Sequence, residues 1–178
     1  MISSKPPSYE SSSSFPLLNS NAPPTYQQAM LMEKAKDIKP TIMLMVGKIN
    51  EISNNGPIAS FIYSDIKPQL KWQETQQLIK SLERITVEGN FDEIVKANKA
   101  AFNGVDALIK TIQESEKNLI SHLYKHQKHP VKYDTLEERN DRIDDIEQRI
   151  NTGKEAEHEI KIISKHSRYL AEIVGDKI

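Results

Sequence analysis

The sequence has no cysteine, one tryptophan and only six glycines among its 178 residues. The absence of cysteine excludes disulfide frameworks, Cys-ligated zinc sites and thiol nucleophiles, and it is typical of proteins from a reducing compartment. The chain must therefore fold by burying apolar side chains alone, and its length predicts about one domain. We expect a cytoplasmic protein, with any association with endomembranes being peripheral.

The chain also has no large excess of charge of one sign and no long apolar run. Lysine and arginine number 24 against 25 aspartate and glutamate residues, which gives a net charge of −1. Proteins that bind nucleic acids usually carry a basic excess that neutralises phosphates, so we expect no nucleic-acid partner. The longest apolar run, residues 42–46, is far shorter than the ~20 residues that a membrane-spanning helix needs. We therefore expect membrane contact to be peripheral at most.

Sequence motifs for catalysis or cofactor binding are missing as well. The chain contains no Gly-rich phosphate loop, no Gly-x-Ser-x-Gly and no His-Glu-x-x-His. His122, His126 and His129 have the spacing of one helix face, but the lysines between them oppose a bound cation. We interpret the many acidic residues of 134–159 as a charged helix face, because adjacent acids on a helix point to different sides. We expect no enzyme activity, no cofactor and no metal site.

The start of the chain, in contrast, is rich in proline and serine. Residues 1–27 hold five of the nine prolines, a composition that is typical of a disordered tail. Two copies of Pro-Pro-x-Tyr stand in this tail, Pro6-Pro7-Ser8-Tyr9 and Pro23-Pro24-Thr25-Tyr26. At these motifs the chain resembles the PY-motif ligands of WW domains, which include adaptors and substrates of Nedd4-type HECT ubiquitin ligases and viral late-budding proteins.

The spacing within each motif has a physical reason. Two consecutive prolines hold a polyproline II turn at low entropic cost, and this turn lies on an aromatic groove of the WW domain. The tyrosine two residues later fills an adjacent apolar pocket. Two motifs in one flexible tail can engage tandem WW domains together, and the second contact adds ~10²–10⁴ in avidity. The resemblance assigns WW binding to six residues: Pro6, Pro7, Tyr9, Pro23, Pro24 and Tyr26.

Residues 28–178 have a different pattern, in which helix formers dominate and apolar residues recur at spacings of three and four. This pattern predicts an all-α domain, a bundle of four to six helices. Pro40 either kinks the first helix or restarts it, and the turn-like residues 152–155 leave one or two helices in the last segment. The expected N-caps are Asn90 and either Asp134 or Thr135. The predicted helices cover residues 28–53, 58–66, about 69–86, 90 to about 124, and the segment from 134 or 135 onward.

Apolar stripes on these segments predict the core of the bundle. In the last segment the apolar residues from Leu136 to Val174 have an approximately heptad spacing. We therefore expect that the C-terminal helices can form a coiled coil and associate with a second copy. Trp72 is expected to pack in the core. The main members of the other stripes are Ile42, Met45, Ile49, Ile52, Ile58, Phe61, Ile62, Ile66, Leu78, Ile79, Leu82, Ile94, Ala101, Val105, Leu108, Ile112, Leu119 and Ile120.

These patterns favour an interaction protein. We expect a non-enzymatic adaptor whose tail recruits WW-domain proteins, HECT ubiquitin ligases in particular, and whose bundle binds a second partner or itself. The motif at Tyr26 is expected to bind more tightly than the motif at Tyr9, because residues 27–31 can continue as a helix turn that packs on the WW domain. An alternative stays open: a membrane-associating bundle, similar to viral matrix or pore-forming proteins, with the PY motifs as late-budding or trafficking signals.

Overall fold

The computed structural model describes residues 23, 25–88, 91–128 and 135–175 of the chain. Within these residues the regular structure is entirely helical, which confirms the all-α prediction. Five helices, α3 to α7, form the bundle in this described part, in agreement with the expected four to six, and α2 precedes them. The helices are α2 (Tyr26–Ala35), α3 (Ile38–Ser53), α4 (Gly56–Tyr63), α5 (Ile66–Glu88), α6 (Phe91–Lys128) and α7 (Leu136–Val174).

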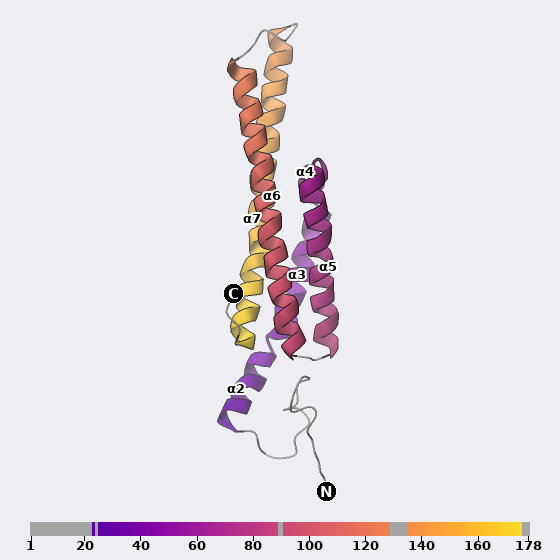
Figure 1. The fold of residues 1–178 in the computed structure, drawn as a ribbon, viewed down its shortest axis with the longest axis vertical. Coiled ribbons are helices and arrows are strands. Elements are labelled where there is room, and N and C mark those ends of the chain that lie inside the picture. The colour runs from indigo at the N-terminus through magenta and orange to yellow at the C-terminus, as the bar shows by residue number, and fades with distance from the viewer. Residues whose placement is uncertain (1–22, 24, 89–90, 129–134, 176–178) are drawn as a thin grey trace.

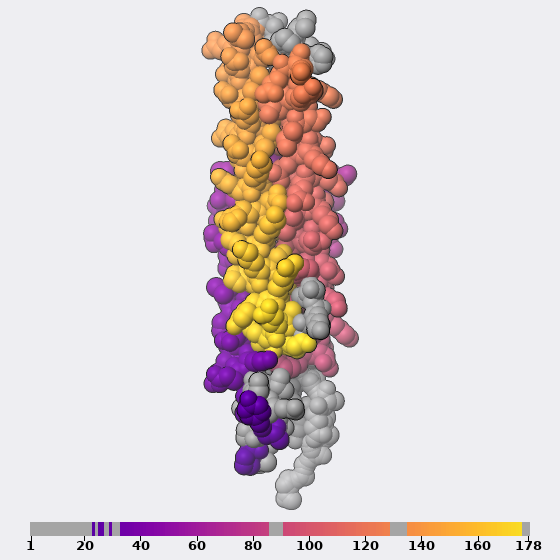
Figure 2. Space-filling model, turned by 90° about the vertical axis from the view of Figure 1, so that its left-hand side faces the viewer, coloured from indigo at the N-terminus to yellow at the C-terminus, as the bar shows by residue number. Residues whose placement is uncertain are grey.

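Helices α6 and α7 lie side by side along the long axis of the molecule and form a hairpin (Figure 1). Helices α3, α4 and α5 pack against the part of this hairpin that is distant from its tip. Past the α4–α5 turn the hairpin continues without them (Figure 1). His122 and Arg149 still line a cavity with residues of α4 and α5, so we call residues 123–128 and 136–148 the projecting hairpin. At the other end α2 extends beyond the bundle, and Figure 2 shows it in indigo below the yellow end of α7.

Local signals explain several helix boundaries. Thr135 is the N-cap of α7, where its side chain accepts a hydrogen bond from the Glu138 N–H at 3.1 Å, so one of the expected caps is confirmed. Pro40 lies in the first turn of α3, which begins after α2 has ended at Ala35. Proline thus restarts the helix, because the first turn needs no intrahelical N–H at that position. The other expected caps, Asn90 and Asp134, lie outside the described residues.

The turn considered at residues 152–155 is wrong, because α7 runs without interruption through this segment. Gly153 is buried inside the helix, at a point where other helices come close. A Cβ atom at this position would lie 2.7 Å from Phe61 Cζ and 3.0 Å from Glu116 Cγ. The glycine therefore allows α7 to approach α4 and α6, and helix packing explains its presence where the sequence pattern indicated a chain reversal.

The core contains most of the expected apolar residues, and Trp72 is fully buried within it. Three expected members are exposed instead, with Ile66 at 61%, Ile120 at 49% and Leu136 at 68%. Ile66 lies outside the face that the α4 residues share, because α4 ends before it and Ile66 begins α5. Leu136 begins α7 in the projecting hairpin, and Ile120 lines a cavity between α6 and α7 together with Glu157.

Helix α7 packs along α6 and also contacts α3 and α4, so its apolar residues contribute to the core of the chain's own bundle. The coiled coil and the self-association through the C-terminal helices stay predictions. In the part of the chain that the structure describes, none of the helices combines the length and the apolar character that crossing a bilayer requires.

Candidate functional site

The second Pro-Pro-x-Tyr motif leads directly into α2. Tyr26 is the first residue of this helix and is 79% exposed. Pro23 and Thr25 are exposed as well. The Ala29 N–H donates to the Thr25 carbonyl oxygen at 2.8 Å, so the first helical turn closes immediately after the motif. The tyrosine ring is thus open to a partner. The other candidate residues lie outside the described residues: Pro6, Pro7, Tyr9 and Pro24.

The position of α2 determines where Tyr26, the last residue of the second motif, lies relative to the bundle. Helix α2 contacts α3 and α7 at the end of the bundle opposite to the projecting hairpin (Figure 1). The predicted division between tail and bundle, at residues 27 and 28, falls within the first turn of α2. A partner held at Tyr26 would therefore lie close to the bundle.

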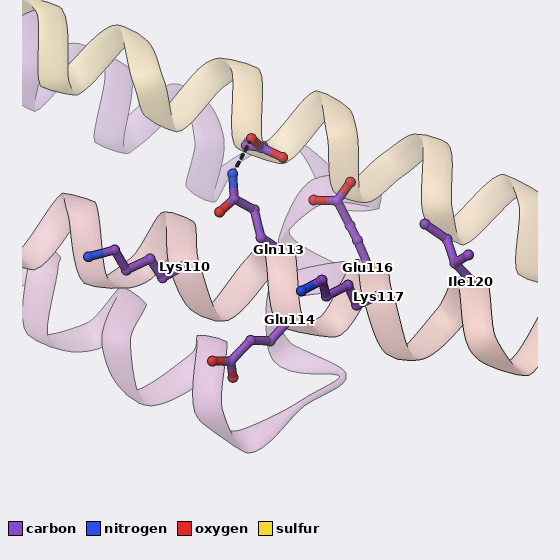
Figure 3. Close-up of a pocket in the computed structure, with 7 residues that line it drawn as sticks. Lys110, Gln113, Glu114, Glu116, Lys117 and Ile120 are labelled. Atoms are coloured by element: carbon purple, nitrogen blue, oxygen red, sulfur yellow. Dashed lines mark hydrogen bonds between the residues drawn. The ribbon is translucent and has the colours of Figure 1, made fainter.

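A second candidate site is a groove between α6 and α7. We define the α6–α7 groove by two cavities, of about 440 and 390 Å³, which share Lys110 and Gln113 as lining residues. Figure 3 shows the cavity nearer the projecting hairpin, where side chains of α6 lie along the neighbouring α7. The residues that line it are Lys110, Gln113, Glu114, Glu116, Lys117, Ile120 and Glu157.

Two carboxyl groups in this cavity have different surroundings. Glu157 on α7 accepts hydrogen bonds from Gln113 Nε2 at 2.8 Å and from Lys161 Nζ at 2.7 Å. Glu116 on α6 is only 6% exposed, and its Oε2 atom accepts no hydrogen bond from any described residue. Glu157 is therefore stabilised as a carboxylate, whereas the Oε2 atom of Glu116 is buried without a donor among the described residues.

The pKa values of the two groups move in opposite directions. Burial and the neighbouring Glu157 raise the pKa of Glu116 to about 7, although Lys154 and Lys161 act against this rise. Burial also acts to raise the pKa of Glu157, but hydrogen bonds from Lys161 and Gln113 outweigh it and lower this pKa below its usual value. Glu116 therefore changes its protonation state near neutral pH, beside a Glu157 that stays ionised.

The other cavity of the α6–α7 groove has four cationic side chains among its nine lining residues, against one aspartate. Lys110 and Lys161 each have an acidic partner on their own helix, at 2.9 and 2.7 Å. The Arg168 guanidinium lies 5.4 Å from the centroid of the Phe102 ring, in a cation–π contact. Lys165 completes the cationic lining. This end of the groove can attract an anionic group.

The histidines singled out in the sequence form a pair. Nε2 of His126 lies 2.9 Å from Nε2 of His122, one turn apart on α6, while His129 lies outside the described residues. No group of three or more His, Cys, Asp or Glu side chains suited to a metal ion occurs in the described part of the chain. The pair therefore lacks a third protein ligand there.

Compared with known proteins, the chain matches no protein-family model, no curated protein and no solved structure. The resemblance at the two Pro-Pro-x-Tyr motifs is confined to short stretches of the tail and gives no information about the bundle.

Sequence reasoning missed the pair formed by Glu116 and Glu157. We interpreted the acidic residues up to Glu159 as a charged face, yet Glu157 faces a carboxyl group on another helix. A signal was present in the apolar register of α6, where Glu116 stands between Ile112 and Leu119 at helical spacing. A charged residue at a core position of a helix indicates either a buried pair or a shifted pKa.

Proposed function

We propose that the chain is a non-enzymatic adaptor that recruits WW-domain proteins, HECT ubiquitin ligases in particular, through its two Pro-Pro-x-Tyr motifs. The observation that carries the proposal is the presence of two complete motifs in one N-terminal segment. The exposure of Tyr26 at the start of α2 supports it, because a WW domain needs the whole tyrosine ring. We propose a cytoplasmic location for this activity.

The bundle supplies the second half of an adaptor. It places Tyr26 at one end and presents the projecting hairpin and the α6–α7 groove to a further partner. We propose that this partner is either another protein or a second copy of the chain, bound through the C-terminal helices. Analytical ultracentrifugation of the full chain over a range of concentrations measures the second of these options directly.

A titration with WW domains tests the recruitment. Purified single and tandem WW domains of a Nedd4-type ligase are titrated into the full-length chain and into Tyr9→Ala, Tyr26→Ala and the double variant. We expect binding that each single substitution weakens and the double substitution abolishes. Tyr26→Ala should cause the larger loss, because α2 continues from Tyr26 and can pack on the bound domain.

The matched control is Tyr124→Ala, since Tyr124 is another exposed tyrosine but lies on α6 outside both motifs. This variant should bind like the unchanged chain. Tandem domains should bind ~10²–10⁴ times more tightly than single ones if both motifs engage together. Binding that persists in the double variant would reject the proposal.

The cationic cavity of the α6–α7 groove favours a second candidate function, peripheral contact with an anionic membrane. Lys165 and Arg168 lie on the same end of α7, where anionic headgroups can meet both charges. Flotation with phosphatidylserine vesicles tests this: Lys165→Ala/Arg168→Ala should reduce the floating fraction, and Lys67→Ala/Lys80→Ala on exposed α5 positions should not. Equal flotation of the two double variants would reject this candidate.

A further inference from the structure

Glu116 is a carboxyl group in an unusual position for an acid. Only 6% of its surface is exposed, and its Oε2 atom has no hydrogen-bond donor among the described residues. Polar atoms buried in this way are nearly always hydrogen-bonded, so an orphan needs a physical explanation. Figure 3 shows its carboxyl group directed from α6 toward α7.

The charged groups around Glu116 come from two helices. Helix α7 presents Glu157 as a like charge and Lys154 and Lys161 as opposite charges. Helix α6 brings its own Glu114 and Lys117 to the same cavity, together with Lys110 one further turn away. Helix α4 contributes the Phe61 ring close to Gly153, and no residue of α4 carries a charge at neutral pH.

The surroundings of Glu116 and Glu157 favour a shared proton over a bound metal ion. Glu157 already accepts hydrogen bonds from Gln113 and Lys161, and the nearby lysines repel a further cation. A protonated Glu116 can donate its O–H to Glu157, which removes one buried charge and satisfies both groups. Loss of that proton leaves two carboxylates facing each other in a poorly solvated space.

The location of the pair gives its titration a mechanical consequence. Gly153 holds α7 against Glu116 and Phe61, with no room for even a Cβ atom. Beyond this point the α4–α5 turn still contacts both helices: Arg149 donates to Ser64, and Leu119 and His122 line a cavity together with Asp65. Past these residues α6 and α7 continue as the projecting hairpin without α3, α4 or α5 (Figure 1). Separation of the two helices at Glu116 would therefore be transmitted to the hairpin.

We propose that Glu116 and Glu157 form a proton-dependent latch, which holds α6 against α7 at the base of the projecting hairpin. The latch is closed when the two carboxyls share a proton and loosens when both are ionised. This property is separate from WW binding and does not depend on it.

The direction of the pH effect follows from the pKa of Glu116, which lies at about 7 in the folded chain against an ordinary value of 4.5. The stability that this group contributes is complete below the ordinary pKa and is lost as the pH rises through about 7. Raising the pH from 6 to 8 should increase the equilibrium constant for opening on the order of tenfold.

Urea unfolding of the full chain at pH 6 and pH 8 provides the first test. Trp72 is the only tryptophan and is buried in α5, so its fluorescence reports unfolding of the bundle. The comparison is between the unchanged chain, Glu116→Gln and Glu114→Gln. Glutamine at position 116 can donate to Glu157 but does not titrate, whereas Glu114 is an exposed acid of the same cavity and gives the matched change in charge.

We expect Glu116→Gln to remove about a tenfold pH response of the unfolding constant that the unchanged chain and Glu114→Gln retain. Histidines ionise in the same pH range, but they are present in all three proteins and cancel in the comparison. A Glu116→Gln chain with the full pH response would overturn the latch.

A second measurement reports the distance between α6 and α7 at the base of the projecting hairpin. Since the chain has no cysteine, Ser121→Cys and Gln148→Cys on exposed positions of α6 and α7 allow two spin labels to be attached cleanly. The distance between the labels should lengthen or broaden from pH 6 to pH 8, and Glu116→Gln should remove this change. A label distance that changes equally with Glu116→Gln would overturn the proposal.

Glu157→Gln covers the case in which Glu116→Gln fails to fold. A neutral residue at position 157 takes away the like charge that helps to raise the pKa of Glu116. The pH at which opening occurs should then move downward in both measurements. An unchanged transition pH in Glu157→Gln would contradict the coupling between the two groups.

Discussion

Asn98 and Ser167 exchange hydrogen bonds across the interface between α6 and α7. Asn98 Nδ2 donates to the Ser167 carbonyl oxygen at 2.9 Å, and Ser167 Oγ donates to Asn98 Oδ1 at 2.7 Å. Both residues are buried, at 1% and 0% exposure. A shift of one helix past the other would leave these polar atoms buried without partners. The pair therefore fixes the register of the two longest helices.

Removal of one member of this pair should destabilise the bundle. Asn98→Ala removes the donor to the Ser167 carbonyl and the Oδ1 acceptor of the Ser167 hydroxyl, which keeps only the backbone carbonyl of residue 98 at 3.4 Å. We expect a loss of ~1–3 kcal/mol in the free energy of unfolding. Urea unfolding followed by Trp72 fluorescence measures it. Asn118→Ala, at an exposed position of the same helix, should change stability by less than about 0.5 kcal/mol. Equal effects of the two substitutions would show that the buried pair does not hold the interface.

Alanine substitutions at two glycines should change the stability of the chain in opposite directions. Gly153→Ala places a methyl group against Phe61 and Glu116, and we expect destabilisation of ~1–3 kcal/mol from overpacking. Gly47→Ala on α3 meets nothing within 4 Å, so the higher helix propensity of alanine should stabilise by ~0.5–1 kcal/mol. Thermal unfolding compares the two variants. Stabilisation by Gly153→Ala would mean that α7 does not need this close approach.

The N-cap of α7 should control the order of the projecting hairpin at its tip, where α7 begins. Thr135→Ala removes the acceptor for the Glu138 N–H and should cost ~0.5–2 kcal/mol locally. Hydrogen exchange of the amides of residues 138–142 should become faster, roughly fivefold for each 1 kcal/mol lost. Thr135→Ser keeps the hydroxyl and should restore slow exchange, and a serine variant as fast as alanine would speak against capping.

Arg139 should protect the last turn of α6. Its guanidinium donates to the carbonyl oxygens of His126, at 3.3 Å, and of Gln127, at 2.8 Å. These carbonyls have no intrahelical partner at a helix end, so Arg139→Ala should increase fraying there. Exchange of the amides of residues 124–128 measures it. Arg142→Ala removes an exposed arginine from the following turn of α7 and should leave those amides unchanged.

The parts of the fold that could be predicted from the sequence depend on neighbouring residues. Pro40 at the start of α3 and Thr135 before α7 act within a single helical turn, and their sequence context is sufficient. Gly153 acts through Phe61, a residue on a different helix. The structural role of Gly153 cannot be predicted from the adjacent residues, which by themselves are typical of a turn. Packing partners that are remote in sequence explain why the sequence left one or two helices open for the last segment.

The PY motifs and the pair of Glu116 and Glu157 also differ in whether neighbouring residues are sufficient to predict them. Each PY motif is a short linear sequence, so it can be found without a structure, although WW binding stays a prediction. The pair of Glu116 and Glu157 exists only because α6 and α7 are antiparallel neighbours with a fixed register. The sequence could indicate that Glu116 occupies an apolar position, but it could not identify the carboxyl group opposite.

The length of α6 has a consequence for any pair of partners. At a rise of about 1.5 Å per residue, the 38 residues of this helix extend over about 57 Å. The PY motif at Tyr26 lies beyond one end of that distance, and the tip of the projecting hairpin lies at the other (Figure 1). If partners bind at both ends, as we propose, the bundle would hold them at a set spacing. A helical insertion of two turns into both α6 and α7 would lengthen this spacing by about 11 Å.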